Sequence, residues 1–491
     1  MKRLFAVVVF AVALAACSDS SPVSPGTSSE SDANLTVSRD GRTAYVLNAN
    51  DAGLGSLRSA VDLANGNPSI SGIEFRSRLA PIALQSTVVF TGLQALSLNG
   101  NRASIDAAAT GDDALRFTGG GDLRISSLTI SHAAQEGIDV EVPAAATGTV
   151  NVTLLGVTIA DNKGHGVLVN DQVDQSAPDG VQPPSAGSDA SVAVTVIGSQ
   201  FQRNGYSVSD RDGLRVNEGG LGDLTFSMTL SKSENNAADG VELDERGNGD
   251  VKFNVVGSTF QENGNFDPED LDDGFDIDEY NDGSIIGKVT LSSAIDNFEE
   301  GFDFNENNTG DFRVDMSFVE ASGNREEGID FEEDDDDATF GSTGGGDLVT
   351  TLIAIKANRN GVDDGDAGVK IREKLLGNLD VAINGVEASD NFRGGISVRE
   401  DGTGNLISSI TKATTLGNAG HGIDHDENSS GDLTATVSSS TSSNNTLFGV
   451  RADQQLASGA GVGTLQLTAV TLTGNVGGTT TGANVTVTVL P

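Results

Sequence analysis

Three short stretches decide the fold of this 491-residue chain: 274-GFDIDE-279, 301-GFDFNE-306 and 328-GIDFEE-333. Each is a glycine followed by an apolar–polar–apolar triplet, and successive glycines are 27 residues apart. The pattern continues on both sides, with two intervals that polar loops lengthen to 34 and 40 residues, at Gly213, Gly240, Gly368, Gly395, Gly422 and Gly449. Loop insertions on a fixed period are typical of a solenoid, in which each repeat adds one coil to a continuous core.

Each repeat also contains a longer segment with alternating apolar residues, such as Leu224, Phe226 and Met228. Alternation places these side chains on one face of a β-strand, which we expect to face the core. Stacked asparagine amides can hydrogen-bond from coil to coil, and asparagine tolerates the left-handed conformation of a sharp corner. A structural asparagine ladder is therefore predicted, because ten repeats carry asparagine 12 residues after the strand begins: Asn162, Asn204, Asn236, Asn263, Asn297, Asn324, Asn360, Asn391, Asn418 and Asn445.

These features resemble the parallel β-helix of the pectate-lyase type, which has coils of this size and an asparagine ladder at a turn. The resemblance covers roughly residues 70 to 490 and concerns architecture, not a catalytic motif. It implies an all-β fold, a single-stranded right-handed parallel β-helix with coils of about 27 residues. The hexapeptide repeats of a left-handed β-helix and the nonapeptides of a calcium roll are absent.

A helix is predicted before the repeats, at residues 56–65, where Leu57, Ala60, Val61 and Ala64 share one face. The surrounding segment resembles the start of many bacterial surface proteins with parallel β-helix repeats. There an amphipathic helix covers the first coil, which would otherwise expose apolar side chains and an unpaired strand edge. We therefore expect an N-terminal cap and first coils at 34–110, and β-helix repeats at 111–491.

The N-terminus predicts export. Lys2 and Arg3 precede an apolar run from Leu4 to Leu14, which is too short to span a bilayer. The run ends in 14-LAAC-17, which resembles the lipobox of bacterial lipoproteins. The resemblance implies a signal peptide at 1–16 and a lipidated Cys17, followed by a Ser/Pro-rich tether at 17–33. The chain would then be secreted and anchored by lipid to the outer membrane or cell surface, facing the periplasm or the exterior.

The charge restricts the partners. The formal net charge is −42, which argues against nucleic acid, since phosphate binding needs clusters of Lys and Arg. Cys17 is the only cysteine, so no disulfide can form within the chain. Two interpretations of the acidity remain open, a multivalent cation as partner or a surface adapted to high salt.

The acidic residues form a stripe two, four and five positions after each repeat glycine. Carboxylates one coil apart repel by about 1 kcal/mol in water, and by more at a lower dielectric. Calcium is a candidate cofactor, because it takes about six to eight oxygen ligands. The candidate metal ligands on three successive coils are Asp276, Asp278, Glu279, Asp303, Glu306, Asp330, Glu332 and Glu333. They are flanked by Asp272, Asp273, Glu299, Glu300, Glu326 and Glu327.

Few residues of the sequence point to catalysis. Lys370, Arg372 and Arg399 interrupt the stripe and are the catalytic candidates if the protein is a lyase, but we expect them to pair with Glu333, Glu373 and Glu400. Aromatic residues make up 5% of the chain, which is few for a polysaccharide groove. The first hypothesis is therefore a non-enzymatic, adhesin-like or structural envelope lipoprotein, stabilised by calcium, whose glycan or protein ligand is not identified. The alternative is a calcium-dependent polysaccharide lyase or other carbohydrate-active enzyme.

Overall fold

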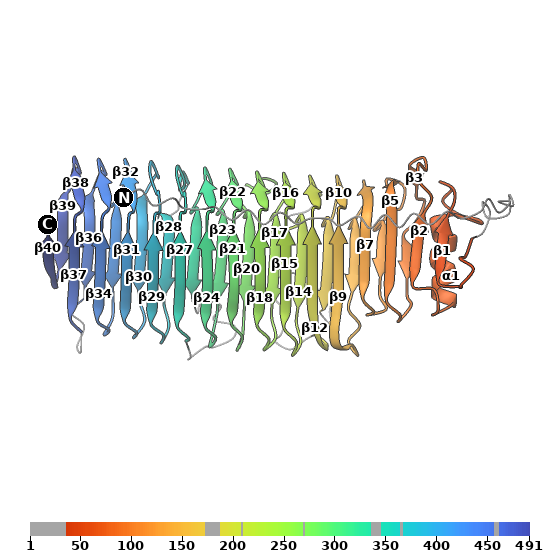
Figure 1. Cartoon of the computed structure of the whole chain (residues 1–491), viewed down its shortest axis with the longest axis horizontal. Helices are drawn as coiled ribbons and strands as arrows, with labels where there is room; N and C mark the ends of the chain where they lie inside the picture. The colour runs from red at the N-terminus through yellow and green to blue at the C-terminus, as the bar shows by residue number, and fades with distance from the viewer. Residues whose placement is uncertain are drawn as a thin grey trace, which may run out of the picture. The chain divides into compact units, whose positions relative to one another are not determined.

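The computed structural model describes residues 36–171, 187–207, 210–268, 271–334, 345–363, 367–455 and 461–491. The expected signal peptide, Cys17 and the tether at 17–33 lie outside the described residues. Residues Thr36–Pro491 form a compact unit in which coils stack along one axis (Figure 1). Within the described part of the chain, no helix is both long and apolar enough to cross a membrane.

Each regular coil contributes three strands, and every strand pairs in parallel with its equivalents in the coils before and after it. One such coil consists of β17 (Val241–Glu245), β18 (Val251–Val256) and β19 (Thr259–Gln261). β17 pairs in register with β20 (Phe275–Glu279), which pairs with β23 (Phe302–Glu306). The predicted right-handed parallel β-helix is confirmed.

The strands fall on three faces. The fourteen-stranded sheet that holds the 27-residue motif, here called the motif sheet, consists of β4 (Val88–Phe90), β6 (Leu115–Phe117), β8 (Ile138–Glu141), β11 (Val167–Asp171), β14 (Leu214–Glu218), β17, β20, β23, β26 (Ile329–Glu333), β28 (Ala367–Glu373), β30 (Gly394–Glu400), β33 (Ile423–Glu427), β36 (Phe448–Gln454) and β39 (Gly478–Ala483).

The second face holds the longer strands β1 (Thr43–Val46), β2 (Gly72–Phe75), β5 (Leu96–Asp106), β7 (Leu123–Ser131), β9 (Thr147–Leu155), β12 (Asp189–Ile197), β15 (Leu224–Thr229), β18, β21 (Ile285–Thr290), β24 (Phe312–Ser317), β27 (Leu348–Ile353), β29 (Leu379–Asn384), β31 (Leu406–Thr411), β34 (Leu433–Ser438), β37 (Gly463–Thr468) and β40 (Val485–Leu490). The third face holds the short strands β3 (Ile82–Ala83), β10 (Thr158–Ala160), β13 (Gln200–Gln202), β16 (Lys232–Glu234), β19, β22 (Ser293–Ile295), β25 (Glu320–Ser322), β32 (Thr414–Leu416), β35 (Thr441–Ser443) and β38 (Thr471–Thr473).

The core follows from the alternation of side chains. In β20, Phe275 and Ile277 point inward and are fully buried, as are Phe302 and Phe304 in β23. Their rings contact one another, with the Phe275 and Phe304 centroids 5.2 Å apart. Edge-to-face pairs of this kind add to the stabilisation that burial of the apolar area gives.

The asparagine ladder lines the corner before the motif sheet. The Nδ2 group of Asn297 donates to Oδ1 of Asn324 at 3.0 Å, and the same bond joins all ten predicted asparagines. Asn475 continues the ladder beyond Asn445. The left-handed residue of the corner lies one position earlier, as at Asp296 with φ 57°, so the asparagines serve the ladder and not the backbone conformation.

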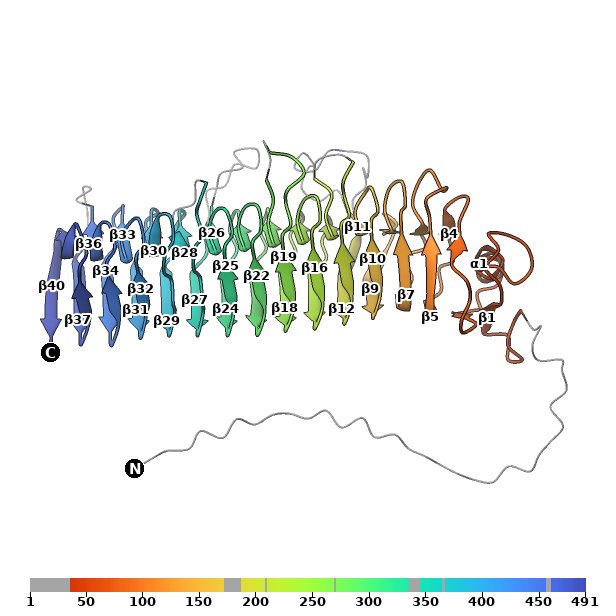
Figure 2. The same cartoon turned by 90° about the horizontal axis from the view of Figure 1, so that it is seen from above.

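The helix α1 (Leu57–Gly66) closes one end of the stack (Figure 2). Ser56 caps it by accepting a hydrogen bond from the backbone N–H of Ser59 at 3.2 Å. Leu57, Ala60, Val61 and Ala64 are its buried residues, as their spacing predicts, and the helix packs against β1 and β4.

Glycines form a column beside the motif sheet, where the chain turns from each of its strands into the next long strand. A Cβ on Gly310 would lie 1.3 Å from the carbonyl oxygen of Gly283, and one on Gly283 would lie 1.8 Å from that of Gly249. The same overlap recurs at Gly346, Gly377, Gly404 and Gly431. Successive coils therefore approach too closely at this turn for any side chain.

Candidate functional site: an acidic cleft

An acidic cleft lies on the outer face of the motif sheet. It has a volume of about 290 Å³ and spans the strands β14, β17 and β20. Outward positions of these strands form its floor, and residues of the preceding loops form its walls. The lining residues are Asp210, Arg215, Asp239, Glu242, Arg246, Leu271, Asp272, Asp273, Asp276, Tyr280 and Glu299.

Two arginines neutralise one end of the cleft. Arg215 is almost completely buried, and its guanidinium lies 2.6 Å from Oε2 of Glu242 and 2.7 Å from Oδ2 of Asp244. Arg246 lies 2.7 Å from the same oxygen of Asp244 and stacks over the ring of Tyr280. Burial would raise the pKa of Asp244, but Arg246 and Arg215 outweigh it and lower this pKa to about 2.

Beyond the arginines the carboxylates are crowded. Burial, together with repulsion by Asp278 and Asp239, raises the pKa of Asp276 well above its ordinary value. Burial and Glu300 do the same to the pKa of Asp273. Oδ1 of Asp276 and Oδ1 of Asp303 are buried and accept no hydrogen bond from any described residue. Buried carboxylates without partners are costly unless they are protonated or bind a cation.

The crowded carboxylates are grouped as metal ligands would be. Oxygens of Asp239, Glu242 and Asp276 lie within 4.8 Å of one another, and so do oxygens of Asp273, Asp276 and Asp303. Three further groups continue the row: Asp210, Asp212 and Glu242; Asp273, Glu299 and Glu300; and Glu300, Glu326 and Glu327. Asp276 belongs to two adjoining groups, and hard carboxylate oxygens are the ligands that calcium and magnesium prefer. The residues therefore fit a divalent cation.

The structure divides the eight predicted metal ligands into three sets. Asp276 and Asp303 lie in the metal-ligand groups. Asp278 lies near them, where burial and Asp244 raise its pKa to about 6 and the hydroxyl of Tyr280 donates to it at 2.8 Å. Asp330 and Glu332 instead contact Nζ of Lys370, each at 2.6 Å.

The remaining three, Glu279, Glu306 and Glu333, point into the coils, which corrects the expectation that they belong to one patch of metal ligands with the outward carboxylates. They stand five positions after the repeat glycine, so they share the inward face with the apolar residues at positions one and three. They belong to a column of eight fully buried side chains, here called the glutamate ladder: Glu218, Glu245, Glu279, Glu306, Glu333, Glu373, Glu400 and Glu427.

One oxygen of each ladder glutamate accepts a backbone N–H of the following turn, as Glu306 does from Gly310 at 2.9 Å. The other oxygen has no hydrogen-bond donor among the described residues. Burial and contact with Glu218 raise the pKa of Glu245 to about 12, whereas the pKa of Glu279 reaches only about 7. A carboxyl group that keeps its proton can donate it to the carboxylate of the next coil, which supplies the missing donor.

The three lyase candidates lie further along the motif sheet and form ion pairs. Nζ of Lys370 pairs with Asp330 and Glu332, which raises its pKa although burial opposes this. Arg372 and Arg399 each lie 2.7 Å from a carboxylate oxygen of Asp401. The expected partners Glu333, Glu373 and Glu400 are not the observed ones, because their side chains point into the coils.

Asp273, Glu299 and Glu300 were expected only as flanking residues, and Arg215 and Asp239 were not among the predicted site residues. Arg215 occupies the second position after Gly213, so the periodic pattern could have placed it on the floor of the cleft. The ligands from the loops, such as Asp239 and Asp273, lie directly before the repeat glycine, and the recurrence of an acidic residue at this position could have found them.

Two aromatic residues join the loops that precede β14 and β20. Tyr206 and Phe266 contact edge to face with centroids 6.1 Å apart, and the Tyr206 hydroxyl donates to Asn265 at 2.9 Å. These loops precede β14 and β20 and lead to cleft residues such as Asp210 and Asp272. Both rings remain about two-fifths exposed, so each offers a face to a ligand.

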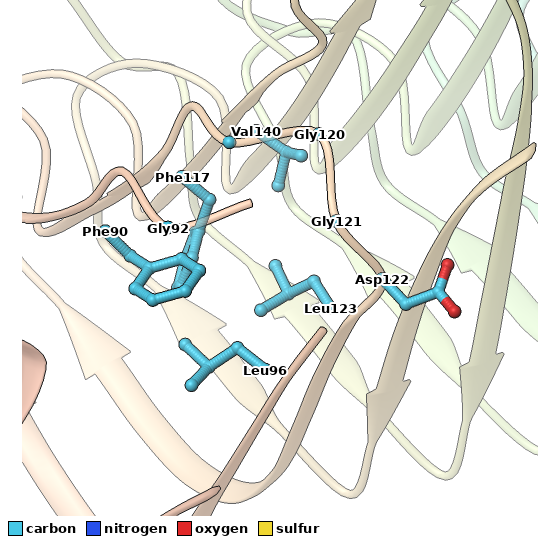
Figure 3. Close-up of a pocket in the computed structure, with 10 residues that line it drawn as sticks. Phe90, Gly92, Leu96, Phe117, Gly120, Gly121, Asp122, Leu123 and Val140 are labelled. Atoms are coloured by element: carbon cyan, nitrogen blue, oxygen red, sulfur yellow. The ribbon is translucent and has the colours of Figure 1, made fainter. Parts of the chain in front are cut away.

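A second cavity has no such chemistry. It lies among the first coils and has a volume of about 10 Å³, enough for one water molecule. Figure 3 shows Phe90, Leu96, Leu123 and Val140 around it, with the Asp122 carboxylate directed away. We regard it as a packing defect.

No protein-family model and no curated protein matches the chain. Solved structures that match it include the periplasmic alginate epimerase AlgG, with 11% identity over 84% of this chain and 78% of that one, at a TM-score of 0.37. The pectate lyase Pel9A matches with 16% identity over 73% and 81% of the two chains, at a TM-score of 0.41. A thermostable GH87 α-1,3-glucanase from Streptomyces thermodiastaticus matches with 14% identity over 92% and 69%, at a TM-score of 0.39.

These matches correct one expectation. A non-enzymatic, adhesin-like or structural role was the first hypothesis from the sequence, whereas the matched structures are carbohydrate-active enzymes. They agree better with the alternative hypothesis. At this level of identity they concern the fold, so the chemistry of this chain has to be argued from its own cleft.

Proposed function

We propose that the protein is a calcium-dependent carbohydrate-active enzyme that acts on an acidic polysaccharide in the cleft of the motif sheet. One observation carries this proposal. Asp276 belongs to two groups of carboxylates, the ligand oxygens of each group lie within 4.8 Å of one another, and Oδ1 of Asp276 accepts no hydrogen bond from the described residues. The cleft is open to solvent, so a cation held there would also be accessible to a ligand from solvent.

The charges around the cleft favour an anionic ligand only when a cation is bound. Without it, Asp239, Glu242, Asp273 and Asp276 would repel a uronic acid carboxylate. Calcium accepts about six to eight oxygens, more than one carboxylate group of this site supplies, so substrate carboxylates can complete the coordination. A bound calcium ion would also withdraw charge from the substrate carboxylate and acidify the neighbouring C–H group.

The side chains around the site have separable roles. Arg215 and Arg246 hold Asp244 ionised and fix the floor of the cleft, while the exposed rings of Tyr206 and Phe266 offer a stacking surface for a sugar ring. Lys370 remains our candidate catalytic residue. Its pairs with Asp330 and Glu332 keep its amine protonated and raise its pKa, so we assign it contact with a substrate carboxylate and not proton transfer.

Arg372 and Arg399 are weaker candidates. Both contact Asp401, which lies in the coils that follow the metal-ligand groups. We propose that they bind the polysaccharide chain beyond the reacting sugar.

The test is turnover of polygalacturonate and alginate with calcium or with EDTA. Ultraviolet absorbance detects the unsaturated product of a lyase, reducing ends detect a hydrolase, and proton NMR detects an epimerised sugar. We expect one of these readouts with calcium and none with EDTA. Asp276→Asn should abolish both turnover and calcium binding measured by calorimetry.

Asp315→Asn is the matched control, because Asp315 is an exposed carboxylate of β24 on a different face. It should leave turnover and calcium binding unchanged. Turnover of a neutral glucan alone would contradict the acidic substrate. The absence of turnover on every substrate, with calcium bound, would overturn the enzymatic function while leaving the metal site.

We also propose that the chain is secreted and anchored by a lipid on Cys17. This proposal rests on the sequence alone, since Cys17 lies outside the described residues. Growth of the producing bacterium with a labelled fatty acid should label the protein, and Cys17→Ser should remove the label and release the protein from membranes. A labelled Cys17→Ser variant would contradict the anchor.

A further inference from the structure

The last strands of the stack each have one free edge. β38, β39 and β40 pair with β35, β36 and β37, and no other described strand pairs with them. Apolar side chains of this coil are exposed, Val476 by 81% and Val489 by 71%. An uncovered strand edge with apolar side chains is a template for pairing with another chain.

The other end of the stack does not share this feature. There α1 lies across the first coils and buries Leu57 and Val61 against them (Figure 2). The end formed by β38, β39 and β40, here called the open end, has no helix over it among the described residues. It also lacks the charged side chains with which exposed edge strands are commonly protected.

The charge distribution indicates what binds there. Residues 454–491 contain no Asp, Glu, Lys, Arg or His, although the chain has a formal net charge of −42. A second copy of the chain is repelled by most of the surface. At the open end it meets an uncharged, identical surface, and a two-fold axis makes such a surface complementary to itself.

The nearest charges are too distant to prevent this contact. Asp453 of β36 pairs in register with Ala483 of the edge strand β39. If two copies meet at this edge, their Asp453 residues are about three strand spacings of ~4.8 Å apart, roughly 14 Å. This exceeds the Debye length of about 8 Å at physiological ionic strength. Arg451 also lies 2.8 Å from Asp453 and partly neutralises it.

We propose that the open end is a docking surface for a second copy of the chain. The edge strand β40 pairs antiparallel with β40 of the copy, and the two stacks join end to end about a two-fold axis. The contact satisfies the free backbone groups of the edge and covers Val487 and Val489. Because both open ends are then occupied, assembly stops at a dimer.

Sedimentation velocity of residues 18–491, over a concentration series in EDTA, tests the proposal. We expect a monomer–dimer equilibrium that persists without calcium. The double variant Val487→Lys/Val489→Lys should raise the Kd at least about 10-fold, since it places charges on the contact. Leu221→Lys is the control, because Leu221 is an exposed apolar residue far from the open end, and this variant should dimerise as the parent chain does.

A cross-link tests the geometry. Residues 18–491 contain no cysteine, so Val487→Cys supplies a single thiol near the middle of β40. Oxidation should give a covalent dimer, whereas Leu221→Cys should not. A monomer at every concentration, or a dimer unaffected by the lysines, would overturn the proposal. Polymers longer than a dimer would also overturn it, since they require contact between unlike ends.

Discussion

Glu279 and Glu306 are paired in register between β20 and β23, and neither side chain is exposed to solvent. Each accepts a backbone N–H with one oxygen and leaves the other facing its neighbours in the glutamate ladder. Two ionised carboxylates would repel strongly at this spacing. The pair is stable when one member holds a proton, and the raised pKa of Glu306, caused by burial and by Glu279, assigns the proton to Glu306.

The ladder makes stability depend on pH in an unusual direction. Burial raises the pKa of Glu245 to about 12, of Glu400 to about 11 and of Glu333 to about 9. An unfolded glutamate has a pKa of about 4.3, so the folded state binds more protons between these values, and the free energy of unfolding falls as the pH rises. We expect a lower Tm near pH 9 than near pH 6, measured by circular dichroism at constant ionic strength.

On the acidic side, one contribution to the loss of stability comes from His425. His425 is fully buried, and burial lowers its pKa to about 4. Its contribution is present above about pH 6.5, the unfolded value, and is lost as the pH falls toward 4. For the glutamate ladder the contradicting result lies on the alkaline side, where a Tm that rose steadily from pH 6 to pH 9 would show that the buried glutamates do not hold protons.

Two substitutions at Glu306 should distinguish the stability that its hydrogen bond with Gly310 contributes from the pH dependence that its bound proton causes. Glu306→Ala removes the acceptor of the Gly310 N–H and should lower the free energy of unfolding by about 1–3 kcal/mol. Glu306→Gln should cost less and flatten the loss of stability above about pH 6. Gln454 shows that glutamine fits this position, since its amide donates to the carbonyl of Gly431 and accepts the N–H of Leu433. Urea unfolding at two pH values measures both effects.

The asparagine ladder should be equally sensitive. Asn324→Ala would remove the acceptor of both the backbone and the side-chain N–H groups of Asn297. These donors are buried, so we expect a loss of about 1–3 kcal/mol for each group left unsatisfied. Asn308→Ala, in a partly exposed turn, should change the unfolding free energy by less than about 0.5 kcal/mol. Equal effects of the two substitutions would argue against the ladder.

The glycine column should not tolerate a methyl group. Gly310→Ala would bring a Cβ within 1.3 Å of the Gly283 carbonyl oxygen, and separating the coils should cost about 3 kcal/mol or more. Gly66→Ala in α1 meets no atom within 4 Å and should be neutral or mildly stabilising. Thermal unfolding of the two variants beside the parent chain provides the comparison.

Calcium should stabilise the folded chain through Asp276. At a free concentration about 100 times the Kd, one site adds about 2.7 kcal/mol to the free energy of unfolding. Asp276→Asn should remove this increment, and Asp315→Asn should retain it. Sodium chloride at matched ionic strength separates this effect from screening, and an equal rise with both salts would point to a surface adapted to high salt.

The sequence was sufficient for the fold because the coil repeats. The spacing of glycines such as Gly274 and Gly301 set the period, and the constant count to asparagine fixed the corner. Asn475 was missed because the closing coil lacks the charged motif. Glu279 was wrongly grouped with the metal ligands because of its charge, whereas its odd position after Gly274 places it on the same face as the core residues.

The cleft was only partly predictable. Asp276 and Asp303 occupy periodic outward positions and could be placed in advance. Asp239 and Asp273 lie directly before the repeat glycine, where an acidic residue recurs in successive coils, but the inward and outward alternation of a strand does not extend to this position. The ion pair of Lys370 was predicted with Glu333, whose side chain was expected on the same face of the motif sheet. Because Glu333 points into the coils, Lys370 pairs with Asp330 and Glu332 instead.

The glutamate ladder also changes what the chain presents to its surroundings. A formal charge of −42 counts every glutamate as ionised, including the buried ones that hold protons. Isoelectric focusing should therefore give a higher isoelectric point for the native protein than for the chain unfolded in urea. A ladder carboxyl that holds its proton in the core adds no negative charge to the surface. Each added coil therefore lengthens the structure by less surface charge than its count of acidic residues implies.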